Sequence, residues 1–291
     1  MIGKKSPQFA SGAALLANPI LPLARIIQML YITGPFERIA PILEELTEPV
    51  EIATSTYQNP KEQLLPYLDD LRIFEQLKHS GQEETLVLEE TLEPLDQFES
   101  LELEVSQRIL IRELEKINSL LCGPCDCTLC CLGPSTDMNQ VFFEIPLQDN
   151  ETDLFNIPRI DTKESRQSDP HAEPPLMVEG APFFQRQAAL YHWDKNWSLI
   201  LPKAGACPNL EQSTGGCAIY QDRPDTCRRP QIFPYALERR PEHDADGRSA
   251  YIAQRKLLAV WDCPYVQELR EEIDAYAQLC GLTPIFKLNK D

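Results

Sequence analysis

The chain has 291 residues, of which 43% are hydrophobic and 25% charged, an ordinary composition for a globular protein with a sizeable core. Its formal net charge of −18 would repel a phosphate backbone, so we expect no nucleic-acid partner. Its ten cysteines are too sparse for a disulfide scaffold, in which cysteine usually exceeds roughly 8–10% of a short secreted chain.

The first 34 residues are apolar and bent by prolines. Lys4 and Lys5 before an apolar stretch give a faint likeness to a signal peptide, but Asn18, Pro19 and Arg25 interrupt that stretch. The same interruptions argue against a transmembrane helix, which needs about 20 mostly apolar residues. We therefore expect residues 1–34 to form an arm, with one short helix near residues 26–31, that packs on the body of a cytoplasmic protein without a membrane partner.

Residues 37–104 are strongly acidic, with 18 acidic and four basic side chains. Asn59 and Pro60 are typical of a helix start, and leucines at helical spacing predict a helix that continues to Gly81. A second, longer helix is predicted over residues 95–121, with Glu113 and Lys116 paired on its surface. Its acidic faces could recruit a basic protein, although a solvated helix surface explains them more simply.

The remaining elements are shorter. We expect a strand at 141–145, an exposed loop at 148–175, and a β-hairpin formed by residues 188–193 and 197–201. Two consecutive helices are predicted at 248–261 and 264–279, the second ended by Gly281. The sequence thus predicts an α+β protein, mainly helical, with a small loop-rich cysteine-cluster domain containing a short β-hairpin.

The predicted organisation has four parts. They are an N-terminal arm (1–34), an acidic helical region (35–121), a cysteine-cluster metal-binding domain (122–265) and a C-terminal helix (266–291). The long helix leads directly into the third part, where Gly123 and Pro124 are expected to end it. Five thiols are thereby placed on one tight loop.

These five thiols lie within the ten residues from Cys122 to Cys131, far more sulfur than a packed core requires. Thiolates are soft ligands, so clustered cysteines with short spacers suit zinc, iron or an iron–sulfur cluster. Three more cysteines follow at ten-residue intervals, each beside a turn signal. The predicted metal ligands are Cys122, Cys125, Cys127, Cys130, Cys131, Cys207, Cys217, Cys227 and Cys263.

Several neighbours of these cysteines suit a metal site. Gly215 and Gly216 let the backbone curl close to the metal, and Asp222 is expected to cap a short helix that carries Cys227. Arg228 and Arg229 follow, and their guanidinium groups could offset the negative charge of several thiolates. Cys263 lies at a helix junction, where ligand and core are equal alternatives. Cys280 is expected to be a buried core residue.

The cysteine pattern resembles the YkgJ-type cysteine-cluster family. The resemblance rests on Cys127-x-x-Cys130-Cys131, on Cys207-Pro-x-Leu, and on Cys217-x-Ile-Tyr-x-x-Arg-Pro-x-x-Cys227-Arg, and it covers about residues 122–235. It implies a zinc- or iron-chelating domain, and the related flagellin lysine N-methylases carry a similar pattern. The family's first cysteine corresponds to Pro124 here, so that Cys122 and Cys125 are alternative substitutes.

The identity of the metal follows less directly. Eight or nine thiols exceed the four ligands of one zinc ion, and the four histidines are scattered, which favours an iron–sulfur centre or iron over zinc. We expect a role in chelation, redox chemistry or assembly. Two alternatives are a protein methyltransferase and a structural zinc domain for protein–protein interaction. No Gly-x-Gly-x-x-Gly loop follows a strand, so a Rossmann-type cofactor site has no support, and the sequence indicates no catalytic residues.

Overall fold

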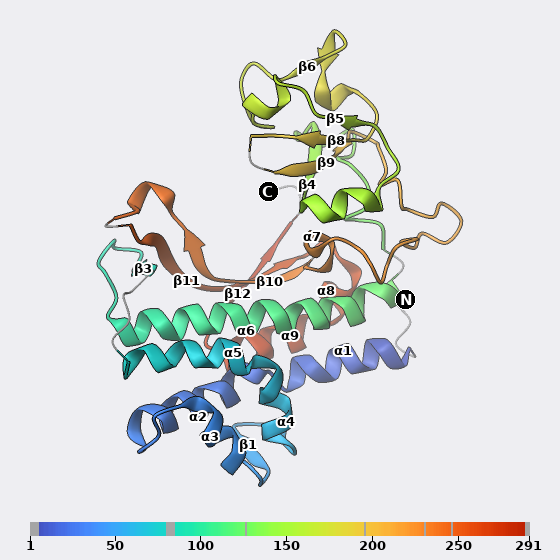
Figure 1. Ribbon diagram of the computed structural model, residues 1–291. Coiled ribbons are helices and arrows are strands. Elements are labelled where there is room, and N and C mark those ends of the chain that lie inside the picture. Colours follow the sequence, from blue (N-terminus) through green and yellow to red (C-terminus); the bar gives the residue numbers. More distant parts are fainter. Residues whose placement is uncertain are drawn as a thin grey trace.

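The computed structural model describes residues 6–79, 85–125, 127–194, 196–229, 231–245 and 247–288. Helices dominate the first 125 residues of this part of the chain and strands most of the rest (Figure 1). The α-helices are α1 (Pro7–Ala17), α2 (Ile20–Thr33), α3 (Ile39–Glu45), α4 (Pro60–Leu64), α5 (Leu68–Leu71), α6 (Gln97–Cys122), α7 (Asp225–Arg228), α8 (Pro264–Glu268) and α9 (Arg270–Leu279).

Four sheets are formed by the strands of the described part of the chain. A central sheet contains β10 (Ile232–Arg239), β11 (Ser249–Val260), β12 (Thr283–Lys287) and β3 (Thr85–Leu88), and a smaller one has the order β4 (Phe142–Leu147), β9 (Trp197–Pro202), β8 (Ala189–His192), β5 (Arg159–Ile160). Two ribbons pair β1 (Val50–Ile52) with β2 (Ser55–Tyr57) and β6 (Met177–Val178) with β7 (Ala181–Pro182). The expectation of a mainly helical protein with one short hairpin is therefore wrong, although the class is α+β.

The largest departure concerns the predicted helix at 248–261, which is the twelve-residue strand β11. This strand pairs antiparallel with β10 and parallel with both β12 and β3. Its run Ala253-Gln-Arg-Lys-Leu-Leu-Ala consists of residues with good helix propensity, but three neighbouring strands satisfy its backbone groups and override that preference. The ladder with β10 is irregular between Tyr235 and Leu237, and Arg255 lies opposite this irregularity with a φ of 48°.

The long helix α6 confirms the helix predicted at 95–121 and lies along the central sheet (Figure 1). Asp96 caps it by accepting a 2.8 Å hydrogen bond from the backbone N–H of Glu99. The predicted surface pair of Glu113 and Lys116 is wrong, because Glu113 is only 2% exposed. Its carboxylate accepts hydrogen bonds from the backbone N–H of Ile20 (2.9 Å) and the hydroxyl of Tyr276 (2.7 Å).

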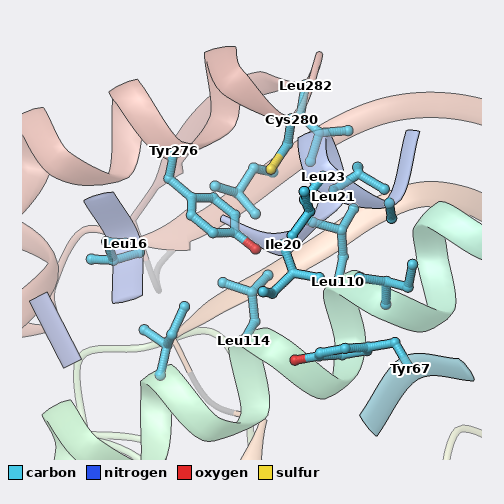
Figure 2. Close-up of a cluster of buried hydrophobic side chains, with 14 of the residues drawn as sticks. Leu16, Ile20, Leu21, Leu23, Tyr67, Leu110, Leu114, Tyr276, Cys280 and Leu282 are labelled. Atoms are coloured by element: carbon cyan, nitrogen blue, oxygen red, sulfur yellow. The ribbon is translucent and has the colours of Figure 1, made fainter. Parts of the chain in front are cut away.

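The N-terminal residues form two helices, α1 and α2, where one short helix was expected. Together they span Pro7–Thr33 and are long and apolar enough to cross a membrane, a test that the core helix of a soluble protein also passes. In this structure Leu16, Leu21 and Leu23 are fully buried in the main core. Figure 2 shows these side chains together with Tyr276 and Cys280 from the C-terminal region. The prediction that Cys280 is a buried core residue is confirmed.

The predicted helix from Pro60 onward is broken into short pieces. α4 is followed by a 3-10 helix (Leu65–Tyr67), then α5, then a second 3-10 helix (Arg72–Leu77). Pro66 has no backbone N–H and interrupts the regular hydrogen bonding after α4. The predicted end at Gly81 lies outside the described residues.

The small sheet confirms the predicted hairpin, since β8 pairs antiparallel with β9 in the register Ala189↔Ile200. The expected strand at 141–145 is present as β4 and pairs with β9. Residues 148–175 contain more structure than an exposed loop, because Thr152, Phe155 and Ser165 are buried there. In Figure 1 this sheet stands apart from α2–α4, with α7 near its base.

The main hydrophobic core draws on the whole length of the chain. It runs from Phe9 in α1 to Leu282 after α9 and includes the thiols of Cys125, Cys263 and Cys280. A second core lies under the small sheet, and Cys207 and Cys227 pack against it. The cysteine-rich segments therefore lie where the two cores approach each other. The four-part domain division stays a prediction.

Candidate metal centre

The first cysteine loop begins where α6 ends. A 3-10 turn (Gly123–Cys125) follows Cys122 directly, and it turns the thiol of Cys125 into the main core, where the residue is 8% exposed. A tight turn follows, in which the backbone N–H of Cys131 donates a 2.8 Å hydrogen bond to the carbonyl of Thr128. These two turns keep the loop compact.

The second cysteine segment is held directly against the first. The N–H of Cys207 donates a 2.7 Å hydrogen bond to the carbonyl of Cys131, and Leu132 forms a β-bridge with Ala206. The N–H of Gly133 donates to the carbonyl of Gly205 at 2.8 Å. Two segments more than seventy residues apart in the sequence are thereby joined by backbone hydrogen bonds at the point where both carry thiols.

Cys217 and Cys227 are positioned by the segment that follows. Cys217 forms a β-bridge with Leu210, which folds its loop back toward Cys207. Cys227 lies in the short helix α7, which starts at Asp225 with Pro224 as its N-cap, so that the expected cap at Asp222 is wrong. The hydroxyl of Tyr220 ties this segment to the end of α6 by a 2.6 Å hydrogen bond to the carbonyl of Ser119.

The best-defined thiol group consists of Cys125, Cys127 and Cys263. Their Sγ atoms all lie within 4.8 Å of one another. Cys125 and Cys263 are buried, and Cys127 is half-buried. Cys263 reaches this group from the end of β11, where it precedes α8. The structure thus places Cys263 both in the core and beside two thiols of the loop, which unites the two alternatives considered from the sequence.

Backbone N–H groups face the sulfurs of this triad. The N–H of Leu129 donates to the Sγ of Cys127 at 3.4 Å. The backbone N–H groups of Tyr265 and Val266 lower the pKa of Cys125 and Cys263 respectively, against the larger opposing effects of neighbouring thiols and burial. Such N–H···S hydrogen bonds are a common feature around metal-bound thiolates.

The remaining thiols surround an open pocket. A cavity of about 320 Å³ is lined by Gln8, Cys122, Gly123, Cys127, Cys130, Cys131, Gly215, Gly216, Cys217, Tyr220 and Gln221. Cys207 and Cys227 belong to the same group, because their thiols interact electrostatically with those of Cys130 and Cys217. Gly215 has a φ of 70°, which side chains other than glycine rarely adopt, and this allows the loop to curl at the rim of the pocket.

Each of the two groups contains one thiol whose pKa is lowered, Cys127 in the triad and Cys130 beside the pocket, among others whose pKa is raised. Hydrogen bonds from Cys125 and Cys263 lower the pKa of Cys127 to about 3, so that this sulfur is the preferred thiolate of the triad. Burial raises the pKa of Cys122 and of Cys227 to about 12. These two thiols are therefore protonated at neutral pH unless a cation displaces the proton.

The cation that interacts most with the thiols is Arg223, which lies between Cys217 and Cys227 and was not predicted for this role. Arg223 is 7% exposed and lowers the pKa of Cys122, Cys130 and Cys227 against burial. Arg228, predicted for this role, donates from Nε to the carbonyl of Arg223 at 2.9 Å, and Arg229 lines a separate pocket. Arg223 was missed because a sequence does not reveal which arginine of a cluster turns inward.

Residues 121–251 match a protein-family model named CxxCxxCC and described as "Putative zinc- or iron-chelating domain". The match confirms the resemblance inferred from the cysteine pattern, and its range contains both cysteine segments but not Cys263. No curated protein and no solved structure matches the chain significantly.

A zinc- or iron-chelating domain requires donor atoms that suit these metals, and thiols are such donors. The predicted thiol ligands come from four parts of the chain: the end of α6, the loop after it, the Cys207–Cys227 region and, outside the matched segment, the turn after β11. None of the ten cysteines forms a disulfide among the described residues, so all ten thiols remain available. Cys280 does not belong to either thiol group. It lies fully buried among core side chains (Figure 2).

Proposed function

We propose that this cytoplasmic protein binds metal at two adjoining thiolate sites, a closed one for a single ion and an open one for an iron–sulfur centre. The observation that carries the proposal is the triad of Cys125, Cys127 and Cys263, with Sγ atoms within 4.8 Å of one another. A metal–sulfur bond is about 2.3 Å long, so the sulfurs around one tetrahedral ion lie roughly 3.8 Å apart. The triad fits that separation.

The fourth ligand of the closed site comes from a neighbouring thiol. Cys122 interacts electrostatically with Cys125 and Cys127, and Cys130 interacts with Cys127. Either one completes a Cys₄ set, which binds zinc or a single iron. In a four-iron cluster each cysteine binds a separate iron, and in a two-iron cluster at most two cysteines share one iron, so three mutually close sulfurs favour a mononuclear ion.

The open site has a different character. Once the closed site has taken four thiols, five of the nine predicted ligands remain at or near the pocket, more than one tetrahedral ion can use, and the described residues that line it include no histidine or carboxylate. All-thiolate coordination is typical of iron–sulfur clusters. Gly215 and Gly216 line this pocket and are partly exposed, which suits a centre that exchanges electrons, ions or a cluster with a partner. We therefore assign chelation, redox chemistry or assembly to this site.

The test is metal and acid-labile sulfide analysis of protein purified without oxygen, together with its visible spectrum. We expect about one zinc or iron without sulfide from the closed site, and iron with matching sulfide and a brown colour from the open site. Colourless protein that contains two zinc ions would show that the open site holds zinc and not an iron–sulfur cluster. Protein that holds neither iron nor zinc would overturn the proposal.

Two single substitutions separate the sites. Cys125→Ala removes a ligand of the closed site alone and should lower the sulfide-free metal. Cys217→Ala removes a thiol of the open pocket and should lower iron and sulfide together. A variant that retains full metal content excludes the replaced cysteine as a ligand.

A further inference from the structure

A second pocket, of about 450 Å³, lies beside the cysteine cluster. It is formed between the last turns of α6 and the Tyr220–Arg228 region and is lined by Gln8, Arg112, Glu115, Lys116, Ser119, Leu120, Tyr220, Gln221, Arg223 and Arg228. Four of these side chains are cationic and one is acidic. This is a local reversal of sign in a chain whose formal net charge is −18.

Arg223 supplies the buried charge of this pocket. Its guanidinium donates to the carbonyl oxygens of Cys227 (3.0 Å) and Tyr220 (2.6 Å) and to the hydroxyl of Ser119 (2.7 Å). All of these acceptors are neutral, and within the described ranges no carboxylate lies within 4.0 Å of it. The thiols of Cys122, Cys130 and Cys227 interact electrostatically with this guanidinium, but no described carboxylate pairs with it, so a bound anion on the pocket side would add to the compensation of a costly buried charge.

The other three cations have weak or incomplete partners. Arg112 forms an ion pair with Asp70 at 2.6 Å through Nη1 alone, and Arg228 approaches Glu115 only to 4.0 Å. Lys116 is exposed and has no ion pair with any residue whose position the structure describes. The thiols do not balance the charges of Arg112 and Lys116. The cation that acts on the pKa of Cys122, Cys130 and Cys227 is Arg223.

The cationic pocket adjoins the thiol pocket. Gln8, Tyr220 and Gln221 line both cavities. The ring of Tyr220 lies 3.9 Å below the guanidinium carbon of Arg223, and its hydroxyl is anchored on Ser119. This rigid aromatic side chain is therefore shared between the two sites. A molecule bound in the cationic pocket would lie next to any metal held by the open thiol site.

We propose that this pocket binds a small anion with two or more carboxylate or phosphate groups. Its volume lies within the range of small-molecule sites, roughly 300–1,000 Å³. Arg side chains recognise carboxylate and phosphate oxygens through paired N–H donors, and the pocket offers three of them. Its position beside the thiols suits a carrier anion that delivers metal or a substrate that is modified there. The binding site itself does not depend on which metal the thiols hold.

The experiment is isothermal titration calorimetry of the full-length protein with tricarballylate, inorganic phosphate and acetate. Tricarballylate and phosphate distinguish the two kinds of anionic group, and acetate is the monovalent control. We expect one site for at least one multivalent anion, with acetate bound at least tenfold more weakly. Affinity should fall with added potassium chloride, because the attraction is largely electrostatic.

The variants are Lys116→Gln, Arg228→Gln and the double variant, with Arg108→Gln as the control. Arg108 lies on α6 one turn before Arg112, pairs with Glu104 at 2.7 Å and does not line the pocket. We expect the double variant to bind the anion at least tenfold more weakly and Arg108→Gln to match the unchanged protein. Because Lys116 is exposed, we expect Lys116→Gln to fold, and this variant alone tests the proposal if Arg228→Gln unfolds.

Metal content measured on the same samples separates this proposal from the assignment of the thiol sites. Anion binding that persists in metal-free protein supports the pocket even if the metal assignment fails. The proposal is overturned if no multivalent anion binds more tightly than acetate, or if Lys116→Gln and the double variant bind as tightly as Arg108→Gln.

Discussion

The hydroxyl of Tyr276 in α9 donates a 2.7 Å hydrogen bond to the carboxylate of Glu113 in α6. Glu113 is completely enclosed by the main core, and burial raises its pKa to about 7. This contact joins the C-terminal helix to the helix that ends at the first cysteine loop. It therefore links the stability of the core to pH.

The raised pKa of Glu113 predicts that the free energy of unfolding decreases as the pH rises. Its folded pKa of about 7 exceeds the ordinary value of 4.5, so between these two pH values the folded chain keeps a proton that the unfolded chain has lost. The resulting stabilisation is present below pH 4.5, is lost by pH 7, and amounts to about 3 kcal/mol. Urea unfolding from pH 4.5 to 8 should show that Glu113→Gln gains this amount relative to the unchanged protein as the pH rises. Curves that stay parallel, as expected for the exposed Glu99→Gln, would contradict the prediction.

Cys263 and Cys280 provide a matched pair of buried thiols. Cys263→Ala should remove the metal of the closed site, because its Sγ belongs to the triad with Cys125 and Cys127. Cys280→Ala should leave metal content unchanged and cost about 1 kcal/mol of unfolding free energy, the effect of a small core deletion. Metal analysis and thermal unfolding of the two variants check this. Equal metal content in both would exclude Cys263 as a ligand.

Gly133 allows the two cysteine segments to approach each other. A Cβ atom at this position would lie 2.0 Å from the carbonyl oxygen of Pro202, so the backbones must separate. We expect Gly133→Ala to cost about 1–3 kcal/mol and to reduce the metal content of the open site, because Cys131 and Cys207 are joined next to it. Gly180→Ala is the control for a loss of stability away from the thiols: its φ of 84° strains an alanine, but its Cβ would meet nothing within 4 Å and it lies in the distant β6–β7 turn, so it should keep its metal. The prediction fails if both variants retain equal metal.

Metal binding should release protons. Burial raises the pKa of Cys122 and Cys227 to about 12, so both thiols carry protons at pH 7 in the metal-free protein. Coordination requires thiolates, and each proton displaced lowers the apparent metal affinity about tenfold for every unit by which the pH falls. Chelator competition at pH 6.5, 7.5 and 8.5 measures this slope. A pH-independent affinity would show that the metal is held without these thiols.

The local features of the chain were predictable because their signals are local. The helix over 95–121 follows from apolar residues at helical spacing, a signal that acts within a few residues. The cysteine loop and its partner segment follow from spacing and turn residues alone. The hairpin of β8 and β9 likewise depends on two adjacent apolar runs.

Features that depend on distant partners were not predictable. β11 was expected to be a helix, because its helix-forming residues carry no sign of the three strands that pair with it. Glu113 was expected on a surface, because its buried partners Ile20 and Tyr276 come from the two ends of the chain. Arg228 and Arg229 were predicted to offset the thiolate charge and Arg223 was not, because the burial of Arg223 depends on its contacts with Ser119 of α6, about a hundred residues away.

The sequence by itself thus determined that this protein carries a cluster of soft metal ligands at the end of a long helix. Cysteine spacing and helix signals are short-range properties that survive without a fold. The tertiary structure alone decided that Cys263 joins Cys125 and Cys127, and that a cationic pocket lies beside the thiols. Both depend on packing α6 against β11 and the Tyr220–Arg228 region, contacts whose free energy appears only when the whole core assembles.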